Sequence, residues 1–167
     1  MGTIDGINLV ERDGLMYEEN KEIPYTGKVV FYHKANILFS LLGIKNDKKS
    51  MEGEYKTGKE DGMWRRWYKN GQKNWEGTYK DGEKDGGWTW WDKNGQKLTE
   101  NVFNKGKEDG MCTWWYGNGK KWMEGVYVDG EENGVWTWWH ENGEKEMEKT
   151  FKNGQLVTVK KSNKKLP

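Results

Sequence analysis

The fold is decided by one stretch of aromatic residues, charges and glycines, which reads Trp64-Arg65-Arg66-Trp67-Tyr68-Lys69-Asn70-Gly71-Gln72-Lys73-Asn74-Trp75-Glu76-Gly77-Thr78-Tyr79. Asn-Gly between two aromatic-rich runs is the strongest short-range signal for a β-hairpin with a two-residue type I′ turn. In that register Trp64 faces Gly77, whose bare backbone the ring would cover, and Arg65 faces Glu76. A three-residue loop would shift this register by one.

The same pattern recurs with a period of 24 residues, which shows that the chain is a repeat protein. Five series keep this spacing, and they include Gly71, Gly95, Gly119 and Gly143; Trp67, Trp91, Trp115 and Trp139; and Glu76, Glu100, Glu124 and Glu148. A second glycine-containing segment, residues 81–86, joins one hairpin to the next. We therefore expect an all-β fold, an elongated antiparallel meander of repeated β-hairpins in a single twisted sheet.

Composition narrows the classes of protein to which the chain can belong. Only 33% of the 167 residues are hydrophobic, but 12 Trp, 8 Tyr and 4 Phe supply an aromatic core. The net charge of +1, with both signs interleaved, argues against nucleic acid as a partner. No apolar run approaches a membrane span, so integral membrane insertion is not expected. Cys112 is the single cysteine, which excludes an internal disulfide. The location stays open: cytoplasmic, or envelope or secreted if a leader has been removed.

The repeat resembles a known family. Met51-Glu52-Gly53-Glu54-Tyr55, Trp75-Glu76-Gly77-Thr78-Tyr79 and Met123-Glu124-Gly125-Val126-Tyr127 resemble the core of MORN repeats. The added Trp-x-x-Trp/Tyr-x-x-Asn-Gly segment looks like the variant MORN repeat of bacterial proteins of the YwqK antitoxin type. The pattern departs at Asn101 and Lys149, which replace the motif glycine, and at Cys112, which replaces a strand tryptophan. The resemblance implies an antitoxin or immunity protein that masks a toxin partner.

We divide the chain into lead-in strands and a cap (1–26), a repeat domain of five hairpins (27–157) and a basic tail (158–167). The first hairpin carries an insertion near residues 35–46, which holds the most apolar run of the chain, Ile37 to Leu42. This run either folds back to cap the first repeat or forms a contact with a partner or a second copy. Its candidate contact residues are Phe39, Leu41 and Leu42.

The adjacent tryptophan pairs place aromatic rings on both faces of the predicted sheet, because strand side chains alternate. The face with Trp64, Trp88 and Trp136 is expected to pack on itself. On the other face an aromatic ladder lies among threonines and glutamates, either placed by the packing of the repeat or serving as a binding surface. The candidate partner-binding residues there are Trp67, Trp91, Trp115, Trp122, Trp139 and Leu98.

No residue set for catalysis, a metal or a cofactor is recognisable. His33 and His140 are each alone in their repeats, and a glutamate that recurs in every repeat is not an active-site pair. We therefore expect a non-catalytic protein-binding module. Two alternatives remain: a carbohydrate or cell-envelope module that stacks sugars on its tryptophans, and a MORN scaffold associated with membrane lipid. The sequence gives no oligomeric state.

Overall fold

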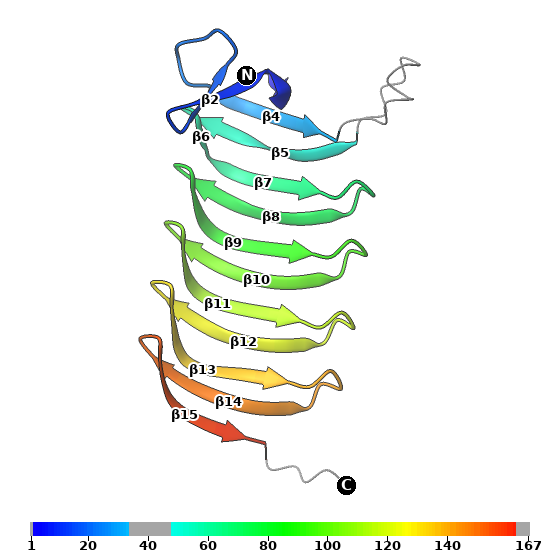
Figure 1. Cartoon of the computed structure of the whole chain (residues 1–167), viewed down its shortest axis with the longest axis vertical. Helices are drawn as coiled ribbons and strands as arrows, with labels where there is room; N and C mark the ends of the chain where they lie inside the picture. Colours follow the sequence, from blue (N-terminus) through cyan, green and yellow to red (C-terminus); the bar gives the residue numbers. More distant parts are fainter. Residues whose placement is uncertain (1, 34–47, 163–167) are drawn as a thin grey trace. The chain divides into compact units, whose positions relative to one another are not determined.

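The computed structural model describes residues 2–33 and 48–162, which form strands joined by short turns (Figure 1). The residues divide into two compact units. The first comprises Met1–Glu83 with Lys93–Gly95, and the second comprises Lys84–Asp92 with Gln96–Pro167. The apolar insertion, with Phe39, Leu41 and Leu42, lies outside the described residues.

In the first unit, strands β4, β5, β7 and β8 pair antiparallel in chain order. At the amino-terminal end β1 pairs with β4 in parallel, and β2 with β3 forms a separate two-stranded sheet. The elements are β1 (Thr3–Asp5), the 3-10 helix η1 (Gly6–Asn8), β2 (Leu9–Arg12), β3 (Leu15–Glu18), β4 (Gly27–Tyr32), β5 (Lys49–Lys56), β6 (Lys59–Glu60), β7 (Gly62–Trp67) and β8 (Lys73–Lys80).

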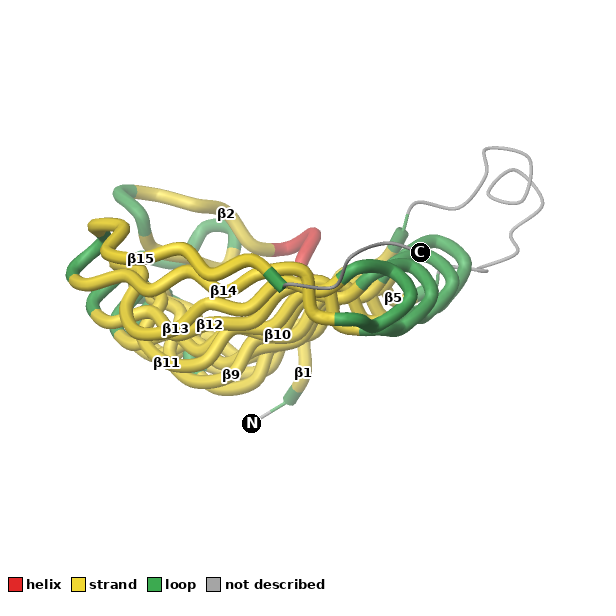
Figure 2. The backbone as a smooth tube through the Cα atoms, turned by 90° about the horizontal axis from the view of Figure 1, so that it is seen from below, coloured by secondary structure: helices red, strands yellow, loops and turns green. Residues whose placement is uncertain are grey.

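In the second unit every strand pairs antiparallel with the next one in the chain. The strands curve along their length (Figure 2). They are β9 (Glu83–Trp91), β10 (Lys97–Asn104), β11 (Lys107–Trp115), β12 (Lys121–Val128), β13 (Glu131–Trp139), β14 (Lys145–Lys152) and β15 (Gln155–Lys161). The predicted all-β fold of repeated antiparallel hairpins is confirmed. The predicted domain boundaries stay a prediction; β15 extends to Lys161, inside the expected basic tail.

The turn at Asn-Gly differs from the two-residue turn predicted and is the three-residue loop that the sequence left as the alternative. At Asn70-Gly71 only Gly71 has a positive φ, of 91°, and Tyr68 and Gln72 close a three-residue loop. A type I turn followed by a left-handed glycine is the usual three-residue hairpin loop. The tight two-residue turns lie at the other ends of the strands (Figure 1): at Asp129-Gly130 both residues have positive φ, 52° and 88°. The prediction of a type I′ turn at Asn-Gly was therefore wrong.

The predicted register of the first full hairpin is nevertheless correct. Trp64 pairs with Gly77 and Arg65 with Glu76. The three-residue loop does shift the pairing by one, so that Trp67 faces Lys73, but a β-bulge at Asn74 inserts one residue and restores it. The same shift follows Trp114 in β11 and Trp138 in β13. In each of these hairpins a one-residue bulge thus offsets the one-residue shift that the three-residue loop causes.

The core consists of aromatic rings laid over glycines. Trp64 lies over Gly53 and Trp136 over Gly125, so that a Cβ at either glycine would overlap the indole ring. The glycine under Trp64 thus belongs to the preceding strand β5, in addition to the predicted cross-strand neighbour Gly77. Edge-on ring contacts extend this core, with ring centroids 5.0 Å apart in Tyr55–Trp64 and in Tyr127–Trp136.

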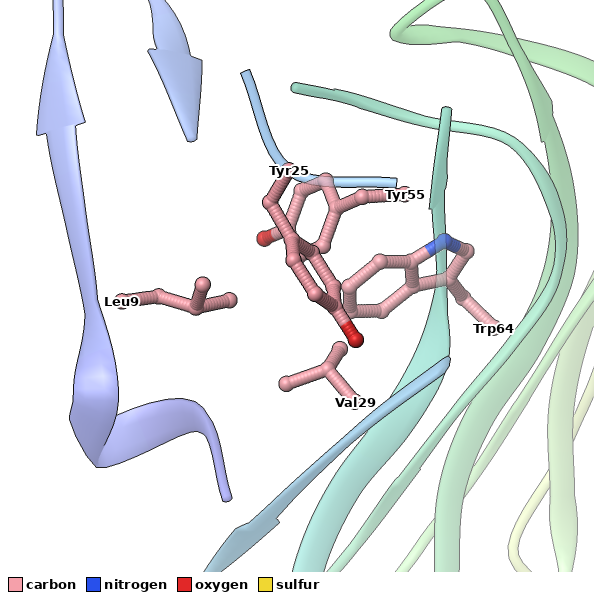
Figure 3. Close-up of a cluster of buried hydrophobic side chains, with 5 residues drawn as sticks. All are labelled: Leu9, Tyr25, Val29, Tyr55 and Trp64. Atoms are coloured by element: carbon pink, nitrogen blue, oxygen red, sulfur yellow. The ribbon is translucent and has the colours of Figure 1, made fainter. Parts of the chain in front are cut away.

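The amino-terminal strands close this core in the first unit. Leu9, Tyr25 and Val29 gather against Tyr55 and Trp64 (Figure 3). Backbone hydrogen bonds join Met16 N to Gly58 O and Gly58 N to Tyr25 O, which ties the segment to the turn after β5. Among the described residues, β2, β3 and the segment that follows them thus pack against this core.

One repeat replaces both partners of the tryptophan–glycine pair. Asn101 stands at the glycine position and faces Cys112, which stands at the tryptophan position. Both are buried. Asn101 Oδ1 accepts from Thr99 Oγ1 at 2.6 Å, its Nδ2 donates to Glu108, and Cys112 Sγ donates to Gly125 O at 3.3 Å. A larger residue on one strand is therefore offset by a smaller one on the next.

We predict that Gly125→Ala destabilises the protein by about 2 kcal/mol, because the new methyl overlaps the Trp136 ring in a packed core. Gly87→Ala is the matched control, since no atom lies within 4 Å of a Cβ there and its φ is not positive. We expect its effect to stay under about 1 kcal/mol. Urea unfolding measures both; equal destabilisation by the two substitutions would contradict the ring-over-glycine packing.

Candidate interaction surface

The first face of the sheet is occupied by its own packing. Trp64, Trp88 and Trp136 are buried. In the second unit the rings of Trp88 and Trp90 stack 5.5 Å apart, and those of Trp136 and Trp138 stack 6.2 Å apart. This is the face that the sequence predicted to pack on itself. It leaves the opposite face as the candidate interaction surface.

On the opposite face, tryptophans of the predicted ladder lie beneath lysine ammonium groups. Lys49 Nζ lies 5.3 Å from the ring centroid of Trp67, Lys97 Nζ 5.1 Å from that of Trp115, and Lys121 Nζ 5.7 Å from that of Trp139. These are cation–π distances. Trp91, the fourth member of the ladder, is half-buried and also makes a contact. The rings of Trp67, Trp115 and Trp139 are therefore not bare platforms.

Each of these lysines forms an ion pair with the glutamate three residues further on, and Lys73 and Lys145 do the same. The distances between Nζ and the carboxylate oxygen are 2.8 Å for Lys73–Glu76 and 2.6 Å for Lys145–Glu148. In a regular strand residues i and i+3 point to opposite faces, and the bulge between them brings both to one face. The other pairs of this lysine–glutamate row are Lys49–Glu52, Lys97–Glu100 and Lys121–Glu124.

Sequence reasoning found the glutamates but missed the lysines. The signal was available, because Lys49, Lys73, Lys97, Lys121 and Lys145 keep the 24-residue period. The hydrogen bond and the charge of Lys145 lower the pKa of Glu148 below its ordinary value. In the first unit Arg65 lies 3.5 Å from Glu52 and 3.4 Å from Glu76. The carboxylates of this row are therefore held by neighbouring cations.

Beside the charged row runs a second feature that the sequence reasoning missed, an exposed apolar stripe in the second unit. We define the stripe as Val102, Met111, Val126 and Val135. Met111 is 63% exposed and pairs across strands with Val126, while Val135 is 54% exposed. Strand alternation puts these residues on the face of Thr113, opposite to Cys112 and the ring core. The signal was an apolar residue directly before a buried core position, as Met111 precedes Cys112 and Val135 precedes Trp136.

Two further predicted contact residues lie at bulges. Leu98 and Trp122 occupy the extra position of the β9–β10 and β11–β12 hairpins, and they are 39% and 42% exposed. The Trp122 ring lies 6.2 Å from that of Tyr116, whose hydroxyl donates to Trp139 O at 2.7 Å. Both residues are therefore accessible at the bulge end of their strands. The role of the predicted site residues in binding stays a prediction.

The described residues contain no group of three or more His, Cys, Asp and Glu side chains that could hold a metal ion. Within the same residues no helix is long and apolar enough to cross a membrane. His33 Nε2 lies 2.9 Å from Trp67 O, and His140 is exposed. Burial, with the charge of Glu108 as a smaller cause, raises the pKa of the Cys112 thiol to about 12, so this thiol is a poor nucleophile.

Comparison with protein families identifies the hairpins. Residues 60–81, 108–129 and 132–153 match the model of the MORN repeat variant. Each matched MORN segment contains one hairpin with its Asn-Gly loop, namely β7–β8, β11–β12 and β13–β14. The hairpin β9–β10, which contains Asn101, lies between the matches. MORN repeats are in general non-catalytic modules that bind proteins or membranes. No curated protein matches the chain.

We predict that native Cys112 resists alkylation by iodoacetamide at pH 8. With a pKa near 12 its thiolate fraction is lower than that of an ordinary thiol by about 1000-fold. Mass spectrometry should show unmodified protein after an exposure that labels the same chain completely in 8 M urea. Rapid labelling of the folded protein, with the folded state verified by circular dichroism, would show that the thiol is neither buried nor suppressed.

Proposed function

We propose that the chain is a non-catalytic protein-binding module of the antitoxin or immunity type, which masks a toxin partner. The observation that supports it most directly is the apolar stripe. Val102, Met111, Val126 and Val135 stand exposed on four neighbouring strands. Contiguous exposed apolar side chains on a folded domain mark interaction sites. Stoichiometric covering of a toxin by this face is the proposed mechanism, and the antitoxin type follows from the resemblance of the repeat.

The groups around the stripe favour a protein over the other candidate partners. The lysine–glutamate row neutralises its own charges, so it provides a polar rim without a single-sign field. An apolar centre with a polar rim is the usual anatomy of a protein–protein interface. The same self-pairing gives anionic lipid headgroups little attraction. Sugar stacking is less well supported, because lysine ammonium groups already lie over the Trp115 and Trp139 rings.

We predict that a Met111→Glu/Val135→Glu variant loses its partner. Two carboxylates on the stripe would be desolvated without compensation in the complex, so capture should fall by at least about 100-fold. Both side chains are more than half exposed, so the folded state should be retained. The measurement is affinity capture from cells of the source organism with wild-type and variant protein as bait, followed by quantitative mass spectrometry.

Leu156→Glu is the matched control. Leu156 is 54% exposed and pairs with Phe151, and the equivalent positions of earlier repeats already hold Glu108 and Glu132. The control should capture the same protein as the wild type. That protein, expressed alone, should stop bacterial growth, and wild-type chain but not the stripe variant should restore growth. Capture of no protein, or equal capture by the stripe variant, would refute the proposed surface; a captured protein without toxicity would refute the antitoxin type alone.

A further inference from the structure

The first unit contains a pocket of about 400 Å³ beside the first Asn-Gly loop. Its volume falls in the range of small-molecule sites. The lining includes two aromatic residues, Trp67 and Tyr68, and three cations, Arg66, Lys69 and Lys93. His33, Asn70 and Asn74 complete the lining, and none of the described residues that line the pocket is a carboxylate. This pocket shares no residue with the apolar stripe, and the sequence singled out Trp67 in its lining but not its cations.

The three cations differ from the lysines of the lysine–glutamate row in having no counter-charge among the described residues. The lysines of the lysine–glutamate row each hold a carboxylate. By contrast, none of Arg66, Lys69 and Lys93 makes an ion pair with a described residue. In a chain with a net charge of +1, three uncompensated cations around one cavity form a local positive field. Such a field attracts an anion.

The repeat does not require these cations. The position of Arg66 is tryptophan in the following three repeats, at Trp90, Trp114 and Trp138. The position of Lys69 and Lys93 is Gly117 and Glu141 in the later two. A residue required by the fold would recur with the period, as Trp67 does. The packing of the repeat therefore does not explain why cations stand here.

The pocket walls are fixed by hydrogen bonds. The ring of His33 contacts Trp67 O at 2.9 Å, which ties the end of β4 to the end of β7. Asn70 Nδ2 donates to Lys93 O at 2.6 Å, and Asn70 Oδ1 accepts from Gln72 N at 3.0 Å. These bonds link two loops whose lysines line the same cavity. A preformed wall lowers the ordering cost of binding a ligand.

We propose that this pocket binds a small anion carried on a flat apolar body, that is, a phosphate monoester or a carboxylate attached to a ring. Arg66, Lys69 and Lys93 supply charge-assisted hydrogen bonds to the anionic group. Lys49, which lies over the Trp67 ring, is not part of the lining, and the surfaces of Trp67 and Tyr68 that do line the pocket supply aromatic contact to the ring of the ligand. The amide of Asn74 lies in the lining as a further polar group for orientation. This binding is non-covalent and involves no reaction of the ligand. It does not depend on the proposed protein partner.

The test is isothermal titration calorimetry of the full chain with four probes. AMP carries a phosphate monoester on a ring and indole-3-acetate a carboxylate on a ring, whereas adenosine lacks the charge and inorganic phosphate lacks the ring. We expect AMP, indole-3-acetate or both to bind at least about tenfold more tightly than adenosine and inorganic phosphate. If only one of the two ring anions binds, its anionic group, the phosphate or the carboxylate, is the one that the pocket recognises. Binding of neither, or equal affinity of a ring anion and its truncated counterpart, overturns the proposal.

Variants locate the binding. The double variant Lys69→Gln/Lys93→Gln should lower the affinity for the probe by at least about tenfold. Arg66→Trp, which introduces the residue of the later repeats, should lower it by a similar factor. Lys152→Gln, an exposed lysine outside the pocket, should leave affinity unchanged. The indole ¹⁵N–¹H signal of Trp67, assigned with Trp67→Phe, should shift on titration. Unchanged affinity in the folded double lysine variant, or a Trp67 signal that does not move at saturation, overturns the assignment to this pocket.

Discussion

The packing of a tryptophan ring on a bare glycine backbone is the contact on which the rest of the structure depends. Trp64 lies over Gly53 and Trp136 over Gly125, and in each case a single methyl group on the glycine would occupy the space of the indole. The ring buries a large apolar area. Because the glycine has no side chain, the ring can lie directly on the backbone and leave no cavity. Pairs of this kind help to supply a core in a chain of which only 33% is hydrophobic.

The lysine–glutamate row on the second face of the sheet results from the way in which the hairpins are closed. A three-residue loop at Asn70-Gly71 shifts the strands by one, and the bulge at Asn74 cancels the shift before Trp64 is reached. The core register is thus preserved. The bulge also turns Lys73 to the face of Glu76, so that an i,i+3 pair can form within a strand. The lysine–glutamate row is therefore a consequence of loop geometry, and it makes the second face polar without leaving its charges free.

Much of the fold could be predicted because the period is visible in the sequence. The register of Trp64 and Arg65 was correct even though the turn type was wrong, since the loop and the bulge introduce opposite shifts that no residue pattern separates. Loop type was misread because Asn-Gly suits both a two-residue and a three-residue loop. Lys97 and Met111 were missed for different physical reasons: the i,i+3 contact of Lys97 requires a bulge, and the exposure of Met111 requires knowledge of which face is buried. Phe39, Leu41 and Leu42 lie outside the described residues, where their role stays a prediction.

In a repeat protein the recurring residues maintain the fold, so function is to be sought where a repeat departs from its neighbours. A departure alone is not sufficient, as Asn101 and Cys112 show. These two residues replace glycine and tryptophan together, face each other and satisfy their polar groups, so the pair compensates within the core. Arg66 and Lys69 depart from the repeat as well, but the described residues that line their pocket include no carboxylate. Compensation therefore separates a structural departure from a functional one: where the protein has balanced the change internally, packing explains it, and where the charge is left unbalanced at a cavity, a ligand from outside is the partner that balances it.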